Sequence, residues 1–142
     1  DHIEVAYNLD DGVEFFGGTV NVQYLSVLFV ADDAIDTDQG YIGKIQYAYV
    51  VLAADSHHGA EMDGSNVAGT SDQSYPQLYN VLFVGHTNLS PASPSSDDQF
   101  PSIIRFREGT GGRFGNIVMF NVATEGIRRT SCVDEGYTSD PS

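Results

Sequence analysis

Acidic side chains recur at matching positions in the first half of the chain, and such carboxylates are candidates for cation binding. Asp36 and Asp38 lie two positions apart, and Glu61 and Asp63 repeat this spacing further along the chain. Residues two apart on a β-strand face the same side, so the four carboxylates are expected to share one surface. Stacked carboxylates ~4.8 Å apart repel by roughly 0.9 kcal/mol in bulk water, a cost that a bound cation removes. We therefore predict a calcium site at these four residues, since calcium prefers hard oxygen ligands. The alternative is a solvated acidic face screened by salt.

Two adjacent histidines, His57 and His58, form a second group with chemical potential. Imidazoles near carboxylates can act as a proton shuttle or as metal ligands. The alternative interpretation is a turn element in which one imidazole bonds to the backbone. The sequence leaves both open.

Arginines make up five of the six basic residues, and all of them follow position 100: Arg105, Arg107, Arg113, Arg128 and Arg129. We expect them to pair with carboxylates of the preceding segments, because the chain carries 20 acidic side chains.

A repeat with a period of roughly 22 to 25 residues positions these groups along the chain. Residues 21–24 match residues 44–47 at an offset of 23, and residues 10–18 match residues 32–40 at an offset of 22. Residues 58–64 continue the series. A fixed period in this range is typical of solenoid architectures.

Each repeat contains two short segments rich in Val, Ile, Tyr, Phe and Thr, and none keeps a helical apolar stripe. The period and the paired segments predict an all-β fold, a right-handed single-stranded parallel β-helix with about six coils. We expect this domain to span residues 1–133, with a linker or frayed tail over residues 134–142. Residues 65–75 and 87–101, rich in Ser, Asp, Gly and Pro, are expected to be loops that leave the solenoid wall.

The composition excludes several classes of function. A formal net charge of -14 repels phosphate backbones and argues against a nucleic-acid partner. The absence of a run of 18 apolar residues argues against membrane insertion. The single cysteine, Cys132, excludes an internal disulfide framework, so it is either a small buried residue or a partner for a thiol elsewhere. Asn88 begins an Asn-Leu-Ser glycosylation sequon. The chain starts directly in a strand-like pattern, and we therefore interpret it as part of a longer protein.

Several strings of the chain resemble a family of secreted parallel β-helix proteins of marine bacteria and stramenopile algae. They are residues 10–22, residues 32–44 and the Arg-Glu-Gly-Thr-Gly-Gly element at 107–112. The resemblance implies an extracellular location. Within algae, similar segments belong to the glycoproteins of mastigonemes, the tubular hairs of flagella, which implies a module of an extracellular filament.

Polygalacturonases provide the main alternative, because they share the parallel β-helix and use paired carboxylates. Residues 36–38, 32–33 and 57–59 resemble their Asn-Thr-Asp, Asp-Asp and Gly-His-Gly elements. Here the order differs, and no Arg-Ile-Lys element follows. A pectate-lyase mechanism would need an arginine base near a calcium site, and the arginines lie two or more coils away in sequence. A shared fold does not transfer an activity.

We therefore predict a non-enzymatic structural module of an extracellular filament or cell-surface protein, which self-associates or stacks on neighbouring modules. The alternative is a polysaccharide hydrolase or lyase, or a glycan-binding module. A glycan-binding role would use a ladder of tyrosines at Tyr7, Tyr24, Tyr47 and Tyr79. The competing interpretation is that these rings stack inward in the core.

Overall fold

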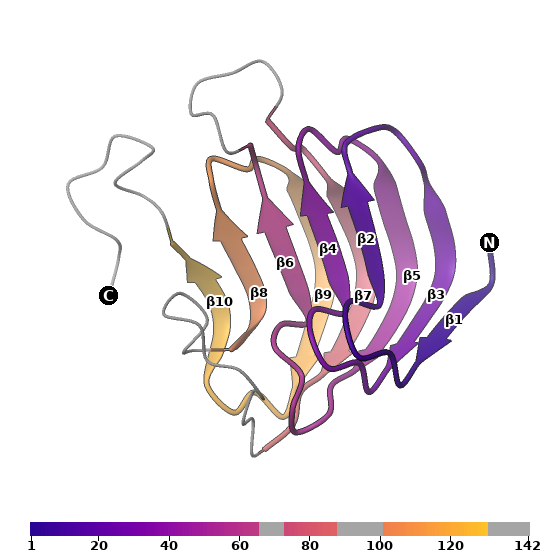
Figure 1. The fold of residues 1–142 in the computed structure, drawn as a ribbon, viewed down its shortest axis with the longest axis vertical. Coiled ribbons are helices and arrows are strands. Elements are labelled where there is room, and N and C mark those ends of the chain that lie inside the picture. The colour runs from indigo at the N-terminus through magenta and orange to yellow at the C-terminus, as the bar shows by residue number, and fades with distance from the viewer. Residues whose placement is uncertain (66–72, 88–100, 131–142) are drawn as a thin grey trace.

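The computed structural model describes residues 1–65, 73–87 and 101–130, and in these ranges all of the regular structure is β-strand. Ten strands form two five-stranded sheets in which every pairing is parallel. Figure 1 shows the two sheets as opposite walls of one solenoid. The predicted parallel β-helix is confirmed.

The chain alternates between the two walls, so each odd-numbered strand is followed by an even-numbered strand and the pair makes one coil. The odd-strand sheet consists of β1 (Ile3–Ala6), β3 (Val22–Leu28), β5 (Lys44–Val51), β7 (Gln77–Val84) and β9 (Arg113–Phe120). The even-strand sheet consists of β2 (Val13–Phe16), β4 (Ile35–Asp38), β6 (Ala60–Asp63), β8 (Ser102–Arg107) and β10 (Glu125–Arg129).

The repeat offsets read from the sequence are the strand registers. Val22 pairs with Ile45, which reproduces the offset of 23, and Val13 pairs with Ile35, which reproduces the offset of 22. The described residues form five coils, whereas the sequence predicts about six. The difference arises because β7 and β8 are the two halves of one long coil, and apolar segments that read as separate coils lie on opposite walls.

The core lies between the walls, where apolar side chains from alternate strand positions meet. In β3 the inward residues are Val22, Leu25 and Val27, so the alternation skips one position. The skip occurs because Tyr24 adopts a left-handed backbone conformation, with φ 57°, which turns two consecutive side chains outward. The equivalent residues of the next three odd strands have the same conformation: Tyr47, Asn80 and Asn116. Asparagine tolerates this region, but tyrosine rarely occupies it.

The four tyrosines that the sequence singles out, Tyr7, Tyr24, Tyr47 and Tyr79, lie on the surface. Tyr24 and Tyr47 stack with ring centroids 5.2 Å apart and are 46% and 47% exposed. Tyr79 is also exposed, and the exposed Tyr7 packs beside Phe29 in a separate pair. The interpretation that these rings stack inward is therefore wrong, because the left-handed residue displaces the inward position by one.

No helix in the described part of the chain has the length and apolar character needed to cross a membrane.

Burial in the core should control stability, and two isoleucines close in sequence provide a matched comparison. Ile45 is fully buried between the walls, whereas Ile42 is 51% exposed. We expect Ile45→Ala to lower the free energy of unfolding by ~2–5 kcal/mol, since it leaves a cavity. Ile42→Ala should change it by less than ~1 kcal/mol. Urea denaturation measures both, and similar losses would contradict the placement of the core.

Candidate functional site

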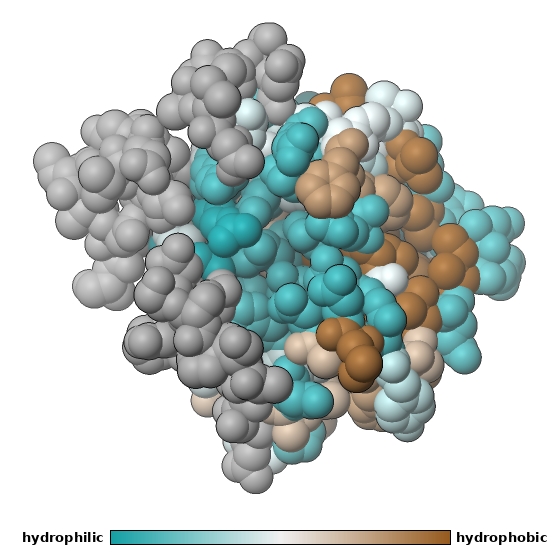
Figure 2. All heavy atoms as spheres, viewed as in Figure 1, coloured by the Kyte–Doolittle hydropathy of each residue, from teal (hydrophilic) through white to brown (hydrophobic). Residues whose placement is uncertain are grey.

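The outward face of the even-strand sheet carries a column of charged residues. Because the strands are parallel and in register, Glu14, Asp36, Glu61 and Arg105 occupy equivalent positions on β2, β4, β6 and β8. Figure 2 shows the hydrophilic area that these strands present at the centre of the face in view. We call this surface the charged face.

Two arginines neutralise the carboxylates of β6. Arg105 Nη1 donates to Glu61 Oε1 at 3.0 Å, and Arg107 Nη2 donates to Glu61 Oε2 at 2.8 Å. Arg107 Nε donates to both carboxylate oxygens of Asp63 at 2.7 Å. Burial would lower the pKa of Arg107, but the bond to Asp63 and the charge of Glu61 raise it overall. Glu61, Asp63 and Arg105 are buried, so this four-residue group is a fixed network that we call the arginine clamp.

The clamp corrects one prediction and confirms another. The arginines were expected two or more coils from the carboxylates, which is wrong for Arg105 and Arg107, because β8 pairs directly with β6. The separation of 44 residues between Glu61 and Arg105 is one long coil rather than two. The expectation that the arginines pair with carboxylates of preceding segments is confirmed for these two, whereas Arg128 lies 3.7 Å from Glu125 on its own strand.

Asp36 lies beside the clamp with one oxygen unsatisfied. Its Oδ1 is buried and has no hydrogen-bond partner among the described residues. Burial raises the pKa of Asp36 from 3.8 to about 8, and the charges of Glu61 and Asp63 act in the same direction. The carboxyl group therefore holds a proton at neutral pH and can donate it.

Asp38 lies on the same strand and on the same side as Asp36, and both are partly exposed. Its Oδ1 accepts the backbone N–H of Gln39 at 2.6 Å, and its Oδ2 accepts Gln39 Nε2 at 3.2 Å. The Cα atoms of residues two apart on a strand lie roughly 6.6 Å apart, so the two carboxyl groups leave the strand side by side.

The predicted calcium ligands come together only in part. Carboxylate oxygens of Asp36, Glu61 and Asp63 lie within 4.8 Å of one another, whereas Asp38 groups with Asp63 and Glu108. The carboxylates of Glu61 and Asp63 already accept bonds from arginine, and a cation here would face two guanidinium groups. This donor set fits calcium poorly, and the calcium site remains a prediction.

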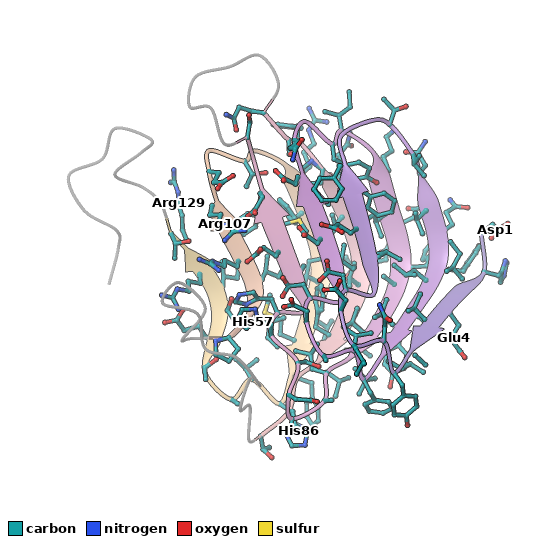
Figure 3. All side chains as sticks on the ribbon, in the orientation of Figure 1. Asp1, Glu4, His57, His86, Arg107 and Arg129 are labelled. Atoms are coloured by element: carbon teal, nitrogen blue, oxygen red, sulfur yellow. The ribbon has the colours of Figure 1, made fainter. Side chains whose placement is uncertain are left out.

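His58 connects the clamp to the backbone. Its Nδ1 accepts the N–H of Ser102 at 2.9 Å, which places the proton of the neutral ring on Nε2. Nε2 lies 3.6 Å from Glu61 Oε1. His57 is not part of the arginine clamp, and its Nδ1 lies 3.2 Å from Asp32 Oδ1 (Figure 3). The interpretation of this pair as a turn element with one imidazole bonded to the backbone is confirmed for His58.

Two carboxylates near the histidines, the half-buried Asp11 and the buried Asp33, hold the coil turns together. Asp11 Oδ1 accepts the N–H of Asp33 at 3.0 Å, and Asp33 Oδ1 accepts the N–H of His58 at 2.7 Å. Burial raises the pKa of Asp11 to about 6 and that of Asp33 well above its ordinary range, with neighbouring acids adding to both shifts. Sequence reasoning did not assign this role, although the repeated Asp-Asp pairs at 10–11 and 32–33 were its visible signal.

The fold and the charged face define the class of protein, a parallel β-helix with an ionisable network on one wall. A family model described as a pectate-lyase like beta helix domain matches residues 1–135, and the chain belongs to this family. No curated protein and no solved structure matches the chain. The predicted sequon at Asn88 and the single Cys132 lie outside the described residues.

The raised pKa values make stability depend on pH. In the unfolded chain these carboxyl groups ionise near 3.8, whereas in the folded state Asp11 ionises at about 6 and Asp36 at about 8. Between those limits the folded state binds more protons, so the free energy of unfolding falls as pH rises, by up to ~1.4 kcal/mol per unit for each group. We expect Asp36→Asn to flatten the decline between pH 6 and 8.

Asp11→Asn serves as the matched control, and it should flatten the decline only below about pH 6. Urea denaturation across this pH range measures both effects. A decline above pH 6 that Asp36→Asn leaves unchanged would contradict the assignment.

Proposed function

We propose that the domain is a polysaccharide hydrolase whose active site lies on the charged face. The observation that carries this proposal is Asp36, a carboxyl group that is protonated at neutral pH, has an unsatisfied oxygen and lies two positions from Asp38. Membership of a pectate-lyase like family agrees with a carbohydrate substrate. The proposal reverses the sequence-based order of the two functions, because the sequence did not reveal that Asp36 has a raised pKa and an unsatisfied buried oxygen.

The proposed chemistry needs one acid and one base. Asp36 donates its proton to the glycosidic oxygen as the bond from that oxygen to the anomeric carbon breaks. Asp38 accepts a proton from water, whose oxygen bonds to the anomeric carbon. Hydrolases with a water between their carboxyl groups, ~6.5–9.5 Å apart, invert the anomeric configuration. We propose an inverting reaction of this kind for Asp36 and Asp38, which lie on one strand and on the same side of it.

The arginine clamp has a positioning role in this scheme. It fixes Glu61 and Asp63 within reach of Asp36, and their negative charges help to keep the Asp36 proton in place. His58 Nε2 lies 3.6 Å from Glu61 Oε1, at the edge of the clamp. Burial is the largest cause of the raised Asp36 pKa, and the carboxylates of the clamp add to it.

Hydrolysis is tested on a panel of plant and algal polysaccharides by the release of reducing ends. We expect Asp36→Asn and Asp38→Asn each to lower kcat/KM by ~10²-fold or more, with Asp55→Asn, an exposed turn residue, as the unaffected control. Activity should decline above about pH 8 as Asp36 loses its proton. NMR of the first product should show inversion.

An unsaturated product would identify a lyase and contradict the hydrolytic scheme. Wild-type activity that survives both substitutions would remove Asp36 and Asp38 from the reaction.

Exposed apolar residues favour a second candidate, the structural module of an extracellular filament. Leu9 and Phe16 are exposed at the β2 end of the stack, and Val122 and Ile127 at the β10 end. Among the described strands, β2 and β10 each pair on one side only, which leaves an edge for a further parallel strand. Head-to-tail contacts of this kind produce fibres such as those of a mastigoneme. An extracellular location belongs to both candidates.

The structural candidate predicts end-to-end association of the purified chain, measured by light scattering and electron microscopy. Phe16→Glu and Ile127→Glu should each abolish it, since a charge would be buried at the contact. Tyr49→Glu, on the outer face of β5, is the control and should leave it intact. Particles that stay monomeric at all concentrations would refute this candidate.

A further inference from the structure

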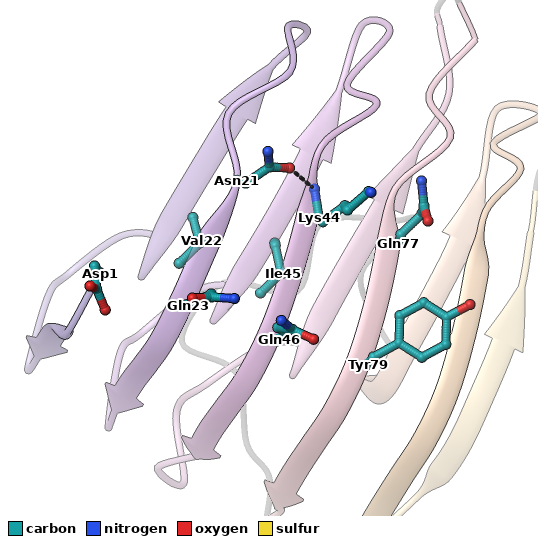
Figure 4. Close-up of a pocket in the computed structure, with 9 residues that line it drawn as sticks. All are labelled: Asp1, Asn21, Val22, Gln23, Lys44, Ile45, Gln46, Gln77 and Tyr79. Carbon is teal, nitrogen blue, oxygen red and sulfur yellow. Dashed lines mark hydrogen bonds between the residues drawn. The ribbon is translucent and has the colours of Figure 1, made fainter.

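A column of aromatic rings lies on the outer face of the odd-strand sheet, on the wall opposite the charged face. His2, Tyr24 and Tyr47 occupy equivalent positions on successive coils, as the register of the flanking residues shows. Figure 4 shows Gln23 and Gln46, which directly precede the two tyrosines, side by side on β3 and β5. The ring centroids of His2 and Tyr24 are 4.5 Å apart, and those of Tyr24 and Tyr47 are 5.2 Å apart. The hydrolase proposal uses none of these rings.

The two tyrosines of this column form a pair that other molecules can reach. Their ring planes lie within 13° of parallel, and both side chains are exposed. A groove of about 410 Å³ is lined by the two rings themselves, and a second of about 540 Å³ begins at the glutamines that precede them. Among the described residues this is the only stack of two tyrosine rings, since Tyr7 packs beside Phe29.

The backbone at both tyrosines is held in a conformation that is unfavourable for them. Their φ values of 57° and 56° lie in the left-handed region, which bulky side chains rarely occupy. In the next two coils the same position holds Asn80 and Asn116, and asparagine adopts this region with much less strain. Asparagine at positions 24 and 47 would relieve the strain. Strain that a sequence retains in this way points to a function of the side chains that cause it.

We propose that Tyr24 and Tyr47 are a modification site, at which a haem peroxidase and hydrogen peroxide join the two rings as a dityrosine. Each phenol loses one electron and its hydroxyl proton and becomes a phenoxyl radical. The two radicals form a carbon–carbon bond between the positions ortho to their oxygens. The two ortho hydrogens then move as protons to the phenolic oxygens, which restores both aromatic rings. The two electrons and two protons that leave the pair reduce one hydrogen peroxide to two water molecules.

The stacked arrangement favours this coupling over other reactions of the radicals. Strand register holds each ring beside its partner, so coupling is an intramolecular step between groups that are already close. Exposed side chains change rotamer within nanoseconds, so the two rings can turn edge to edge as the bond forms. The product joins the second and third coils covalently. The chain has one cysteine and cannot form an internal disulfide, so the dityrosine supplies a cross-link that its thiol cannot.

The experiment treats the folded protein with a haem peroxidase and hydrogen peroxide, isolates the monomer in denaturant and digests it with trypsin. Trypsin cleaves after Lys44 and next after Arg105, so it separates Tyr24 from Tyr47. We expect residues 1–44 and 45–105 to remain joined in one product, lighter than the two peptides together by two hydrogen atoms. Fragmentation in the mass spectrometer should locate the bond at the two tyrosines. The Tm should rise by roughly 5–10 °C, because the cross-link restricts the unfolded chain.

Tyr24→Phe and Tyr47→Phe keep the stacked rings but remove one phenol, so each should abolish the joined product and the rise in Tm. Tyr49→Phe and Tyr79→Phe remove other exposed tyrosines of the same sheet and should form the product as the wild-type protein does. Tyr24→Phe should leave any polysaccharide hydrolysis unchanged, since the charged face lies on the opposite wall.

The inference is overturned if the treated monomer contains no joined product, if Tyr24→Phe still forms it, or if other tyrosine pairs couple to the same extent. Dityrosine found only in covalent dimers would also overturn it, because the coupling would then join two copies of the chain rather than two coils of one.

Discussion

Parallel backbone pairing between successive coils is the constraint on which the rest of the molecule depends. Each coil lies directly over the preceding one at ~4.8 Å, so residues at equivalent positions form columns. A side chain within a column has one neighbour on the coil above and one on the coil below, and the strand register fixes both in place. The character of each column, apolar, aromatic, amide or charged, therefore decides whether the stack is stable and what its surface can bind.

Charge in the even-strand columns shows how this constraint acts. Glu14, Asp36 and Glu61 repel because the register fixes their spacing. The structure relieves that repulsion in two ways: arginines of β8 neutralise the β6 carboxylates, and Asp36 retains a proton. The proton on Asp36 that relieves the repulsion also makes this residue a proton donor at the surface of the column.

The two walls have opposite characters for a related reason. Among the described residues, acidic side chains are confined to the even strands, the first strand and the turns, and the outer face of β3, β5, β7 and β9 carries amides, tyrosines and two unpaired cations. The left-handed residue in each of these strands turns two consecutive side chains outward and so makes this surface denser than strict alternation allows. One solenoid thus presents two chemically distinct surfaces.

The sequence alone determined the coil period, the strand registers of the first three coils and the outward direction of Asp36, Asp38 and Glu61, because repeats and alternation are local properties. It did not determine that Arg105 and Arg107 reach the β6 carboxylates, since a coil of 44 residues breaks the period that carried the alignment. Nor did it show that the tyrosines face outward. A single left-handed residue shifts the alternation, and the types of the residues at these positions do not indicate it. Only the stacked structure decided which charges are neutralised and which remain free to act, because that depends on contacts between residues far apart in the chain.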